Sequence, residues 1–360
     1  MMRVILTGGG TGGHIYPAIA IGQKIMDENP GSEIIYVGIK NGPEEAIANK
    51  NGYKFVSIDA MGIPRKINKR LFKAIIKNLK GFKEAKKIIK SFKPDLVIGT
   101  GGYVCAPILY QAAKKKIPAI VHESNSYPGM ATKFLSKKVD RVLISYEQAG
   151  KYLKNQDNIV VTGNPVRNNF NLAYTDEDLE NLGIDKNIPV VFSFGGSNGS
   201  FALNKAVAEL AENLDGEFYL LHQTGVRYYD SFIENTKENK YIKVFKYIDN
   251  IDLFYGVSGL VIASSGAMSL AEISSVGRPS ILIPKAYTTE NHQEFNARTY
   301  VEKEASLMIL EKDLNGLLLK SEIMSIINDK EKMKKMGEEA HKLADNNALD
   351  KVYEQIKELV

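Results

Sequence analysis

A strand that runs directly into a glycine-rich turn occurs twice in this sequence, and it constrains the fold more than any other feature. The apolar run Val4–Leu6 leads into the turn Gly8–Gly13, and Val190–Phe194 leads into Gly195–Gly199. After each turn, short apolar runs alternate with segments of helix length. This alternation is typical of parallel strands covered by helices on both faces. It predicts an α/β fold of two doubly wound parallel-sheet domains that face a central cleft.

The apolar runs also give the expected strands and domain limits. Gly and Pro residues end the first series near Thr162–Arg167, so we expect one domain over residues 1–163 and a second over residues 164–346. A final helix over residues 347–360 could pack back on the first domain. The expected strands are Val4–Leu6, Glu33–Val37, Phe55–Ile58, Leu96–Ile98, Ala119–Val121, Arg141–Ile144, Ile159–Val161, Val190–Phe194, Tyr219–Leu221, Lys243–Phe245, Leu260–Ile262 and Ser280–Ile283.

Composition and charge restrict the classes of protein further. Hydrophobic residues make up 44% of the 360 residues and charged residues 25%, which excludes a disordered chain. No secretory signal is expected at the N-terminus, and the single cysteine, Cys105, fits a reduced cytosolic setting. The net charge is +5, yet residues 65–93 contain twelve Lys and Arg against one acid, Glu84. This concentration predicts a local anionic partner rather than general affinity for nucleic acid.

Polar loops follow three of the expected strands in the first domain. Gly8–Gly13 precedes a helix whose first residues are expected to be Ile15 to Ile19. The amides there could bind an anion, or the glycines could merely close a tight turn. His14 ends this loop, where a neutral imidazole could act as a general base or could only hydrogen-bond backbone. The turn Thr100–Pro107 and the loop His122–Asn125 follow two neighbouring strands. In the second loop, Glu123 and Asn125 could bind a ligand or cap the loop.

The second domain contains a comparable loop at Ser264–Glu272. A helix that begins near Ala267 could hold a diphosphate at its N-terminal amides, and Glu272 could accept hydrogen bonds from a ribose. The alternative is a capping box between Ser269 and Glu272. Neither glycine turn has the Gly-Lys-Ser/Thr of a P-loop, and the first differs in spacing from the dinucleotide fingerprint.

Eight motifs in order resemble those of the MurG family, which comprises the UDP-N-acetylglucosamine: N-acetylmuramyl-(pentapeptide) pyrophosphoryl-undecaprenol N-acetylglucosamine transferases of bacterial peptidoglycan synthesis. The resemblance implies the GT-B fold of two Rossmann-like domains. The motifs are GGGTGGHIYPAIA (8–20), GTGGYVCAP (99–107), HESN (122–125), GNPVR (163–167), FGGSNG (194–199), HQTG (222–225), SSGAMSLAEI (264–273) and NHQEFNA (291–297).

The resemblance implies that the donor UDP-GlcNAc binds mainly on the second domain. The backbone of Ile248 would read the uracil, Glu272 the ribose and Gln293 the sugar. Tyr103, Glu123 and Asn296 are further possible contacts of the acceptor or the sugar. The implied donor-binding residues are Thr11, Gly12, Gly13, Asn125, Arg167, Ser197, Ile248, Ala267, Met268, Ser269, Leu270, Ala271, Glu272 and Gln293.

The implied reaction is inverting transfer of GlcNAc to the C4 hydroxyl of the muramyl sugar of lipid I, which gives lipid II. We expect His14 to be the catalytic base, and the amides of residues 267–269 with Arg167 to hold the charge of the departing UDP. Asp176 and Asp178 have the spacing of a metal-binding Asp-x-Asp motif but precede the second domain's first strand, so we expect no metal and no cofactor. Ser124, Cys105 and Met130–Lys133 depart from the family pattern, which leaves fine acceptor contacts open.

The basic segment has an apolar stripe at helical spacing. Leu71, Ile75, Leu79 and Phe82 recur every three or four residues, with Phe72 and Ile76 beside them. Such a helix could lie on anionic lipid heads, or it could be an ordinary domain helix. We predict a membrane patch of Phe72, Ile75, Leu79 and Phe82, and a peripheral location on the cytoplasmic face of the cell membrane. The partners expected are UDP-GlcNAc, lipid I, anionic inner-leaflet phospholipids and, further, the cell-wall synthesis and division machinery.

Three other functions stay open at this point. A UDP-GlcNAc 2-epimerase has the same fold but places carboxylates around the sugar that this sequence does not show. A diacylglycerol glycosyltransferase would differ only in its acceptor. A non-catalytic membrane-recruiting subunit is disfavoured because the His14 loop and the donor region 264–297 occur in one chain.

Overall fold

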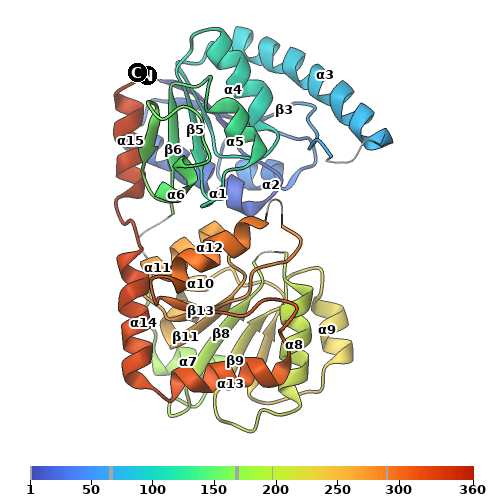
Figure 1. Ribbon diagram of the computed structural model, residues 1–360, viewed down its shortest axis with the longest axis vertical. Helices are drawn as coiled ribbons and strands as arrows, with labels where there is room; N and C mark the ends of the chain where they lie inside the picture. Colours follow the sequence, from blue (N-terminus) through green and yellow to red (C-terminus); the bar gives the residue numbers. More distant parts are fainter. Residues whose placement is uncertain (1, 65–67, 167–169, 197, 289–290) are drawn as a thin grey trace. The chain divides into compact units, whose positions relative to one another are not determined.

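The computed structural model describes residues 2–64, 68–166, 170–196, 198–288 and 291–360. The chain divides into two compact units (Figure 1): unit 1 contains Met1–Val166 and Asn346–Val360, and unit 2 contains Arg167–Asp345. Each unit has one sheet whose paired strands are all parallel. The predicted α/β class with two doubly wound sheets is therefore confirmed.

Unit 1 has a seven-stranded sheet in the order β3-β2-β1-β4-β5-β6-β7. The apolar runs predicted as strands all form strands here. Their bounds are β1 Arg3–Thr7, β2 Glu33–Gly38, β3 Lys54–Ser57, β4 Leu96–Gly99, β5 Ala119–Glu123, β6 Arg141–Ile144 and β7 Ile159–Val161.

Helices cover both faces of this sheet. In β1, Val4 and Leu6 pack into one core cluster, whereas Ile5 packs into the other. This alternation is the expected consequence of a strand buried on both faces. One layer contains α1 Gly12–Glu28, α2 Pro43–Lys50 and α15 Ala348–Lys357. The other contains α3 Lys69–Phe92, α4 Cys105–Lys114 and α5 Met130–Leu135, and the short α6 Glu147–Gly150 follows β6.

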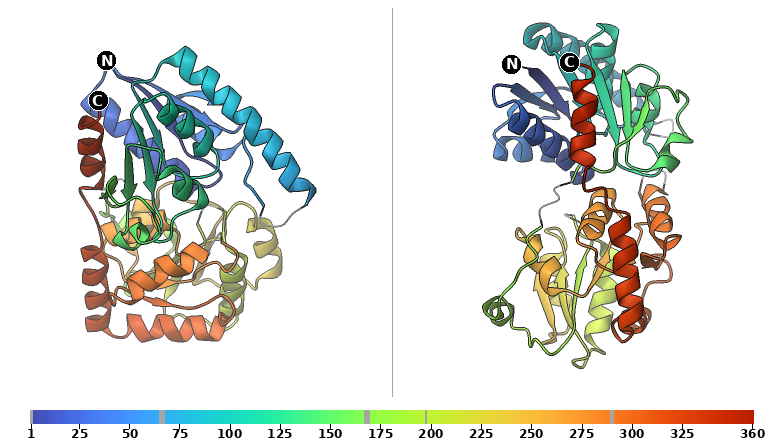
Figure 2. Two further views of the ribbon diagram at one scale, coloured as in Figure 1. Left: turned by 45° about the horizontal axis from the view of Figure 1, so that its top comes forward. Right: turned by 90° about the vertical axis from the view of Figure 1, so that its left-hand side faces the viewer.

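The last helix of the chain belongs to unit 1. Val352 and Ile356 of α15 are each 1% exposed and join the core cluster around β1 and α1. The amide of Asn29, at the end of α1, donates to the hydroxyl of Tyr353. Figure 2 shows α15 running alongside the sheet of unit 1.

Helix α3 is packed along only part of its length. Asn68 caps its start by accepting from two backbone amides, and Ala85, Ile89 and Phe92 of its second half lie in the core. In its first half, between residues 69 and 80, only Ala74 is buried. None of the described helices combines the length and the apolar character that crossing a membrane requires.

Unit 2 has a six-stranded sheet in the order β10-β9-β8-β11-β12-β13. Its strands are β8 Val190–Phe194, β9 Tyr219–Gln223, β10 Ile242–Phe245, β11 Leu260–Ala263, β12 Ser280–Leu282 and β13 Ser306–Met308, of which β13 was not predicted. Its helices are α7 Asp176–Leu182, α8 Phe201–Ala211, α9 Tyr229–Asn235, α10 Ile251–Val257, α11 Ala267–Ser275, α12 His292–Val301, α13 Gly316–Ile327 and α14 Lys330–Lys342.

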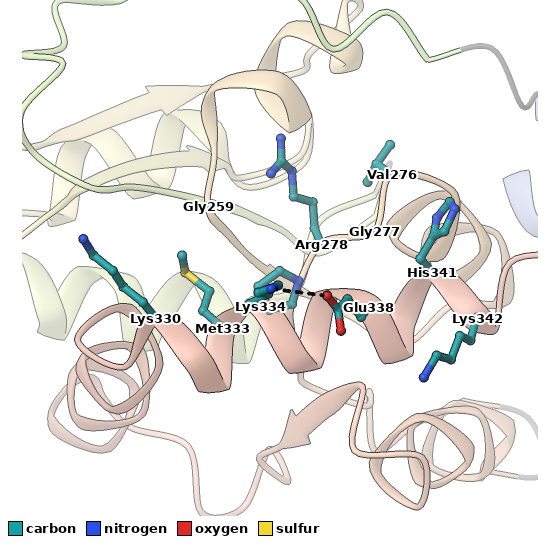
Figure 3. A pocket seen from close by; sticks show the side chains of 12 residues that line it. Gly259, Val276, Gly277, Arg278, Lys330, Met333, Lys334, Glu338, His341 and Lys342 are labelled. Carbon is teal, nitrogen blue, oxygen red and sulfur yellow. Dashed lines mark ion pairs between the residues drawn. The ribbon is translucent and has the colours of Figure 1, made fainter.

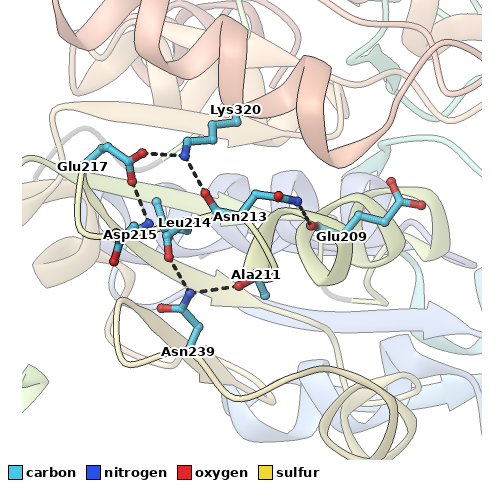
Figure 4. Close-up of polar contacts among 8 residues, drawn as sticks. All are labelled: Glu209, Ala211, Asn213, Leu214, Asp215, Glu217, Asn239 and Lys320. Carbon is cyan, nitrogen blue, oxygen red and sulfur yellow. Dashed lines mark hydrogen bonds and ion pairs between the residues drawn. The ribbon is translucent and has the colours of Figure 1, made fainter.

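A polar network ties the helices of unit 2 to the chain that enters β9 and β10 (Figure 4). Lys320 of α13 donates to the carbonyl of Asn213 and pairs with Glu217. Asn239 donates to the carbonyls of Ala211 and Leu214, at the end of α8. These bonds satisfy carbonyl groups at a helix end that the helix itself leaves without partners.

The strand order reverses once in each sheet, between β1 and β4 in unit 1 and between β8 and β11 in unit 2. Loops that follow the two strands at such a point turn to opposite faces of the sheet and leave a crevice at the carboxyl edge. Both glycine turns seen in the sequence begin at these points. Ligand binding is therefore expected at the carboxyl edge of each sheet.

Candidate functional site

In unit 1, helix α1 begins at Gly12, which is earlier than the sequence pattern predicted. His14 therefore lies in the first helical turn, and it is half-buried. Its Nδ1 lies 3.1 Å from the carbonyl oxygen of Thr100, and the Thr100 hydroxyl donates to the His14 carbonyl at 2.5 Å. Because a carbonyl only accepts, Nδ1 carries the proton, and in the neutral ring Nε2 holds the lone pair.

The turn after β4 is shaped to take this imidazole. Gly101 has φ +110°, and a Cβ there would lie 2.4 Å from His14 Nδ1. Only glycine permits both the conformation and the close approach. Tyr103, in the same turn, is 40% exposed and lies beside Gly10. Cys105 is fully buried and donates to the carbonyls of Thr7 and Gly101, and burial raises the pKa of its thiol to about 12.

A buried carboxylate that the sequence analysis missed holds the first glycine loop. Glu44, in α2, is 1% exposed. One of its oxygens accepts from the amide of Gly10 at 3.3 Å and the other from the amide of Ile39 at 2.9 Å. Glu44 lies six residues beyond Gly38, the last residue of β2. A dinucleotide-binding fold holds a ribose with an acid at the end of this strand, whereas Glu44 binds the glycine loop.

The loop after β5 is organised by Glu123, which is 3% exposed. One oxygen accepts from the side-chain and backbone amides of Asn125 at 3.0 and 3.1 Å. The other accepts from the amide of Gly129 at 3.0 Å and the hydroxyl of Thr132 at 2.7 Å. Of the two alternatives considered for Glu123, this geometry favours loop capping over a direct sugar contact. Asn125 is half-buried.

In unit 2, the turn after β8 is held by a cation that the sequence analysis did not assign a role. The Lys285 ammonium donates to the carbonyls of Gly195 and Gly199 at 2.7 Å each. Its burial lowers its pKa, and Glu311 opposes that shift. Gly199 has φ +74°, and a Cβ there would lie 2.0 Å from the carbonyl oxygen of Thr224. The Lys285 ammonium therefore holds the turn after β8 in one conformation.

Helix α11 begins at Ala267, as predicted, with Gly266 as its N-cap and no side-chain cap. Ser269 is thus the third residue of the helix, and the capping-box alternative for Ser269 and Glu272 is wrong. The hydroxyl of Ser264 is buried and has no hydrogen-bond partner among the described residues. Glu272 accepts from the hydroxyl of Tyr255 at 3.1 Å. The orphan hydroxyl of Ser264 precedes the start of this helix, and Glu272 is its sixth residue.

The remaining donor residues differ in what they can offer a ligand. Leu270 is fully buried, whereas Met268 and Ala271 are half-buried. The amide of Ile248 already donates to Gln223 Oε1 at 2.9 Å, which leaves its carbonyl for a ligand. Gln293 Oε1 accepts from the backbone amide of Lys285 at 3.0 Å. This bond fixes the orientation of the side-chain amide and therefore the position of its Nε2 donor.

Asn296 is 0% exposed and donates to the carbonyl of Ser265, which argues against the sugar contact expected of it. Two other predicted residues, Arg167 and Ser197, lie outside the described residues. Asp178 forms a capping box with Thr175 at the start of α7, which explains the Asp-x-Asp spacing without a metal. The described residues contain no group of three or more His, Cys, Asp or Glu side chains that could hold a metal ion.

A cavity of about 650 Å³ in unit 2 lies away from these loops (Figure 3). It is lined by α14 and by the turn 276–279. Gly259 and Pro279 directly precede β11 and β12, so this cavity is at the amino edge of the sheet. Arg278 donates from here to the carbonyls of Tyr255 and Gly256, and it anchors the end of α10. The cavity shares no lining residue with the donor loops described above.

Comparison with known protein families assigns both units to one class of enzyme. Residues 4–144 match the glycosyltransferase family 28 N-terminal domain, and residues 190–353 match the family's C-terminal domain. Both units are thus those of a two-domain glycosyltransferase. The chain belongs to glycosyltransferase family 28.

A full-length relative agrees with this assignment, and two solved structures share the fold. The UDP-N-acetylglucosamine–N-acetylmuramyl-(pentapeptide) pyrophosphoryl-undecaprenol N-acetylglucosamine transferase of Finegoldia magna is 46% identical over 364 residues, which cover 100% of this chain and 98% of that protein. MurG of Acinetobacter baumannii has a TM-score of 0.79 at 22% identity, over 99% of this chain and 100% of that one. UDP-GlcNAc 2-epimerase of Neisseria meningitidis, solved with UDP-GlcNAc bound, has a TM-score of 0.69 at 15% identity, over 99% and 100% of the two chains.

Two buried histidines, one in each unit, are the next-to-last residues of β5 and β9. The Nε2–H of His122 donates to the Gly163 carbonyl at 3.0 Å, and burial lowers the pKa of its imidazole. His222 lies between the hydroxyl of Ser193 at 2.6 Å and the amide oxygen of Asn204 at 3.1 Å, and burial lowers its pKa to about 3. Both are structural residues, unlike the half-buried His14.

His222 makes the stability of the protein depend on pH. The folded pKa lies below the unfolded value of about 6.5, so only the unfolded chain takes up the proton between these values. The contribution of His222 to the free energy of unfolding is therefore fully present above pH 6.5, and it falls by about 1 kcal/mol for each pH unit below that value. We expect His222→Gln to reduce this slope in urea unfolding between pH 6.5 and 5. His341→Gln, at an exposed histidine, should keep the wild-type slope. An unchanged slope in His222→Gln would contradict this account.

Proposed function

We propose that this protein transfers GlcNAc from UDP-GlcNAc to the C4 hydroxyl of the muramyl sugar of an undecaprenyl-pyrophosphoryl-MurNAc-pentapeptide, with inversion at the anomeric carbon. The observation that carries the proposal is the match of both halves to family 28, together with full-length identity of 46% to a transferase of that name. In this function the enzyme acts in peptidoglycan synthesis and so supports cell shape and division.

The donor binds at the carboxyl edge of the sheet in unit 2. The diphosphate lies at the amides of residues 267–269, where the helix dipole and the orphan hydroxyl of Ser264 favour an anion. Glu272 accepts from the ribose hydroxyls, and its bond to Tyr255 orients it. Gln293 donates to the sugar, while the carbonyl of Ile248 accepts from the uracil. Lys285, beneath the turn 195–199, adds positive charge for the departing UDP.

The acceptor sugar lies against unit 1. Because the Thr100 carbonyl fixes the proton on Nδ1, Nε2 of His14 is the atom that takes the proton from the C4 hydroxyl. Asn125 and Tyr103 contact the sugars from neighbouring loops. The displacement needs a base for the nucleophile and stabilisation of the diphosphate, and these residues supply both without a metal ion in the scheme.

The first half of α3 is proposed to dock on the inner leaflet from the cytoplasmic side. Phe72, Ile76 and Leu79 are 64%, 68% and 60% exposed, and Ile75 is 45% exposed. Phe82 was predicted to belong to the patch, but it is half-buried, and its ring packs edge-on against Tyr110 with the ring centres 5.4 Å apart. The membrane patch is therefore defined as Phe72, Ile75, Ile76 and Leu79. Contacts with cell-wall synthesis and division proteins stay a prediction of the resemblance.

An epimerase remains the main rival, since its fold is similar. The assay that separates the two uses radiolabelled UDP-GlcNAc with lipid I in detergent, followed by extraction. We expect label in the lipid phase and no ManNAc. Formation of ManNAc without labelled lipid would establish the epimerase instead.

His14 is tested in the same assay. We expect His14→Ala to bind UDP normally but to lower kcat by about 10²- to 10⁴-fold, the usual contribution of a general base. His14→Gln should lose as much, although an amide can still donate to the Thr100 carbonyl. His341→Ala, on α14, is the control and should keep wild-type turnover. Near-normal turnover in both His14 variants would assign the base elsewhere.

The membrane patch is tested by replacing Phe72, Ile76 and Leu79 with Ser. Each side chain gains roughly 1 kcal/mol on entering the lipid interface, so binding to phosphatidylglycerol vesicles should fall by about 100-fold. UDP binding should not change. The matched control is Leu317→Ser in unit 2, where an apolar side chain is 69% exposed. Vesicle binding that survives the triple substitution would rule the patch out.

A further inference from the structure

Unit 1 has a second cavity, of about 400 Å³, beside α5 and the chain that follows α6. Four of its six lining residues are lysines, and no carboxylate is among the described residues that line it. We name it the lysine cavity. Its lining residues are Lys133, Phe134, Lys137, Lys138, Tyr152 and Lys154.

Aromatic rings hold two of these ammonium groups in place. Lys133 Nζ lies 3.8 Å from the centre of the Tyr127 ring, and Lys138 Nζ lies 5.3 Å from that of Tyr110. The Tyr127 and Tyr152 rings are themselves 4.5 Å apart. Four like charges around one cavity repel each other unless an anion enters it. The arrangement therefore fits a ligand with more than one negative charge, such as a diphosphate.

The lysine cavity adjoins the loop proposed for the muramyl sugar. Thr132, the residue before Lys133, donates to Glu123 at 2.7 Å, and the other oxygen of Glu123 holds Asn125. The first lysine of the cavity is thus one residue away from the hydrogen bonds that shape the sugar loop.

The cavity also adjoins the helix proposed for the membrane. The ring of Phe134 stacks on Tyr110 at 5.9 Å, and Tyr110 meets Phe82 of α3 at 5.4 Å. Phe134 is 44% exposed. A row of aromatic side chains therefore leads from the cavity to the helix that bears the membrane patch.

We propose that the lysine cavity binds the diphosphate of the lipid acceptor, an assignment that rests on the proposed function. The acceptor is a sugar joined through a diphosphate to a polyprenyl chain. In unit 1 the loop after β5, proposed for the sugar, adjoins the lysine cavity, and the cavity adjoins helix α3, proposed for the membrane. This order matches that of sugar, diphosphate and polyprenyl chain in the acceptor. The lysines neutralise the phosphates, and the row from Phe134 to Phe82 contacts the first apolar units of the chain.

The test is the double substitution Lys137→Ala with Lys154→Ala. Among the described residues neither of these ammonium groups lies over an aromatic ring, so the ring contacts of Lys133 and Lys138 are left in place. The control is Lys50→Ala with Lys54→Ala, two exposed lysines of α2 and β3 that remove the same charge. Activity is measured in neutral detergent micelles without phospholipid. We expect the KM for lipid I to rise about tenfold, as for loss of charge-assisted hydrogen bonds. The kcat and the KM for UDP-GlcNAc should stay within about twofold, and the control should match wild type.

A second acceptor isolates the diphosphate. With a muramyl sugar joined to its chain through an uncharged linker, wild type and double variant should have equal KM values. An unchanged KM for lipid I, or an equal rise with both acceptors, would overturn the proposal. Loss of binding to phosphatidylglycerol vesicles with an unchanged KM in micelles would assign the cavity to phospholipid head groups and overturn it too. Failure of wild type to label lipid I would instead overturn the proposed function, and this assignment with it.

Discussion

All strands in both sheets are parallel and are covered by helices, and this burial decides where the protein can do chemistry. Central residues such as Ile5, Leu6 and Ile262 have no exposed surface. Buried polar side chains of the strands, such as His222 and Ser193, are hydrogen-bonded to each other and are not available to a ligand. The groups proposed to act lie in the loops, and every loop that follows a strand emerges at the same edge. The order reversals at β1/β4 and β8/β11 separate these loops and leave room for a ligand.

Buried charged side chains then give the loops a single geometry. Glu44 holds the loop after β1, Glu123 the loop after β5, and Lys285 the turn after β8. In each case a charged group is hydrogen-bonded to backbone groups of the loop, which offsets the free energy lost on removing it from water. The catalytic arrangement proposed here depends on this, because the ring of His14 is oriented by a backbone carbonyl and by a glycine that allows close approach.

Local signals predicted much of the fold. Apolar runs and glycine turns located twelve strands, while β13, Ser306–Met308, was not predicted. Glu44 was missed because the amide of Gly10 that it binds is 34 residues away and reaches it only when β2 pairs with β1. Helical spacing placed Phe82 on the apolar stripe, but spacing cannot show that Tyr110 of another helix covers it.

Motif resemblance had a different limit. It selected Glu123 and Asn296 as candidate contacts, yet it carries no information on burial, and both side chains are inside the protein and bound to loop groups. Asn125, beside Glu123, has an amide and is half-buried, whereas Gln293, near Asn296, is only 9% exposed. Sequence therefore located the loops of the site, and tertiary packing decided which side chain of each loop can act.

The central claim is that the carboxyl edge of the sheet in unit 2 is where the nucleotide sugar binds. A crystal structure of the protein with UDP-GlcNAc tests it most directly. The account predicts the diphosphate within hydrogen-bond distance of the amides of residues 267–269 and the ribose on Glu272. A donor bound instead at the amino edge, in the cavity beside α14, would contradict it.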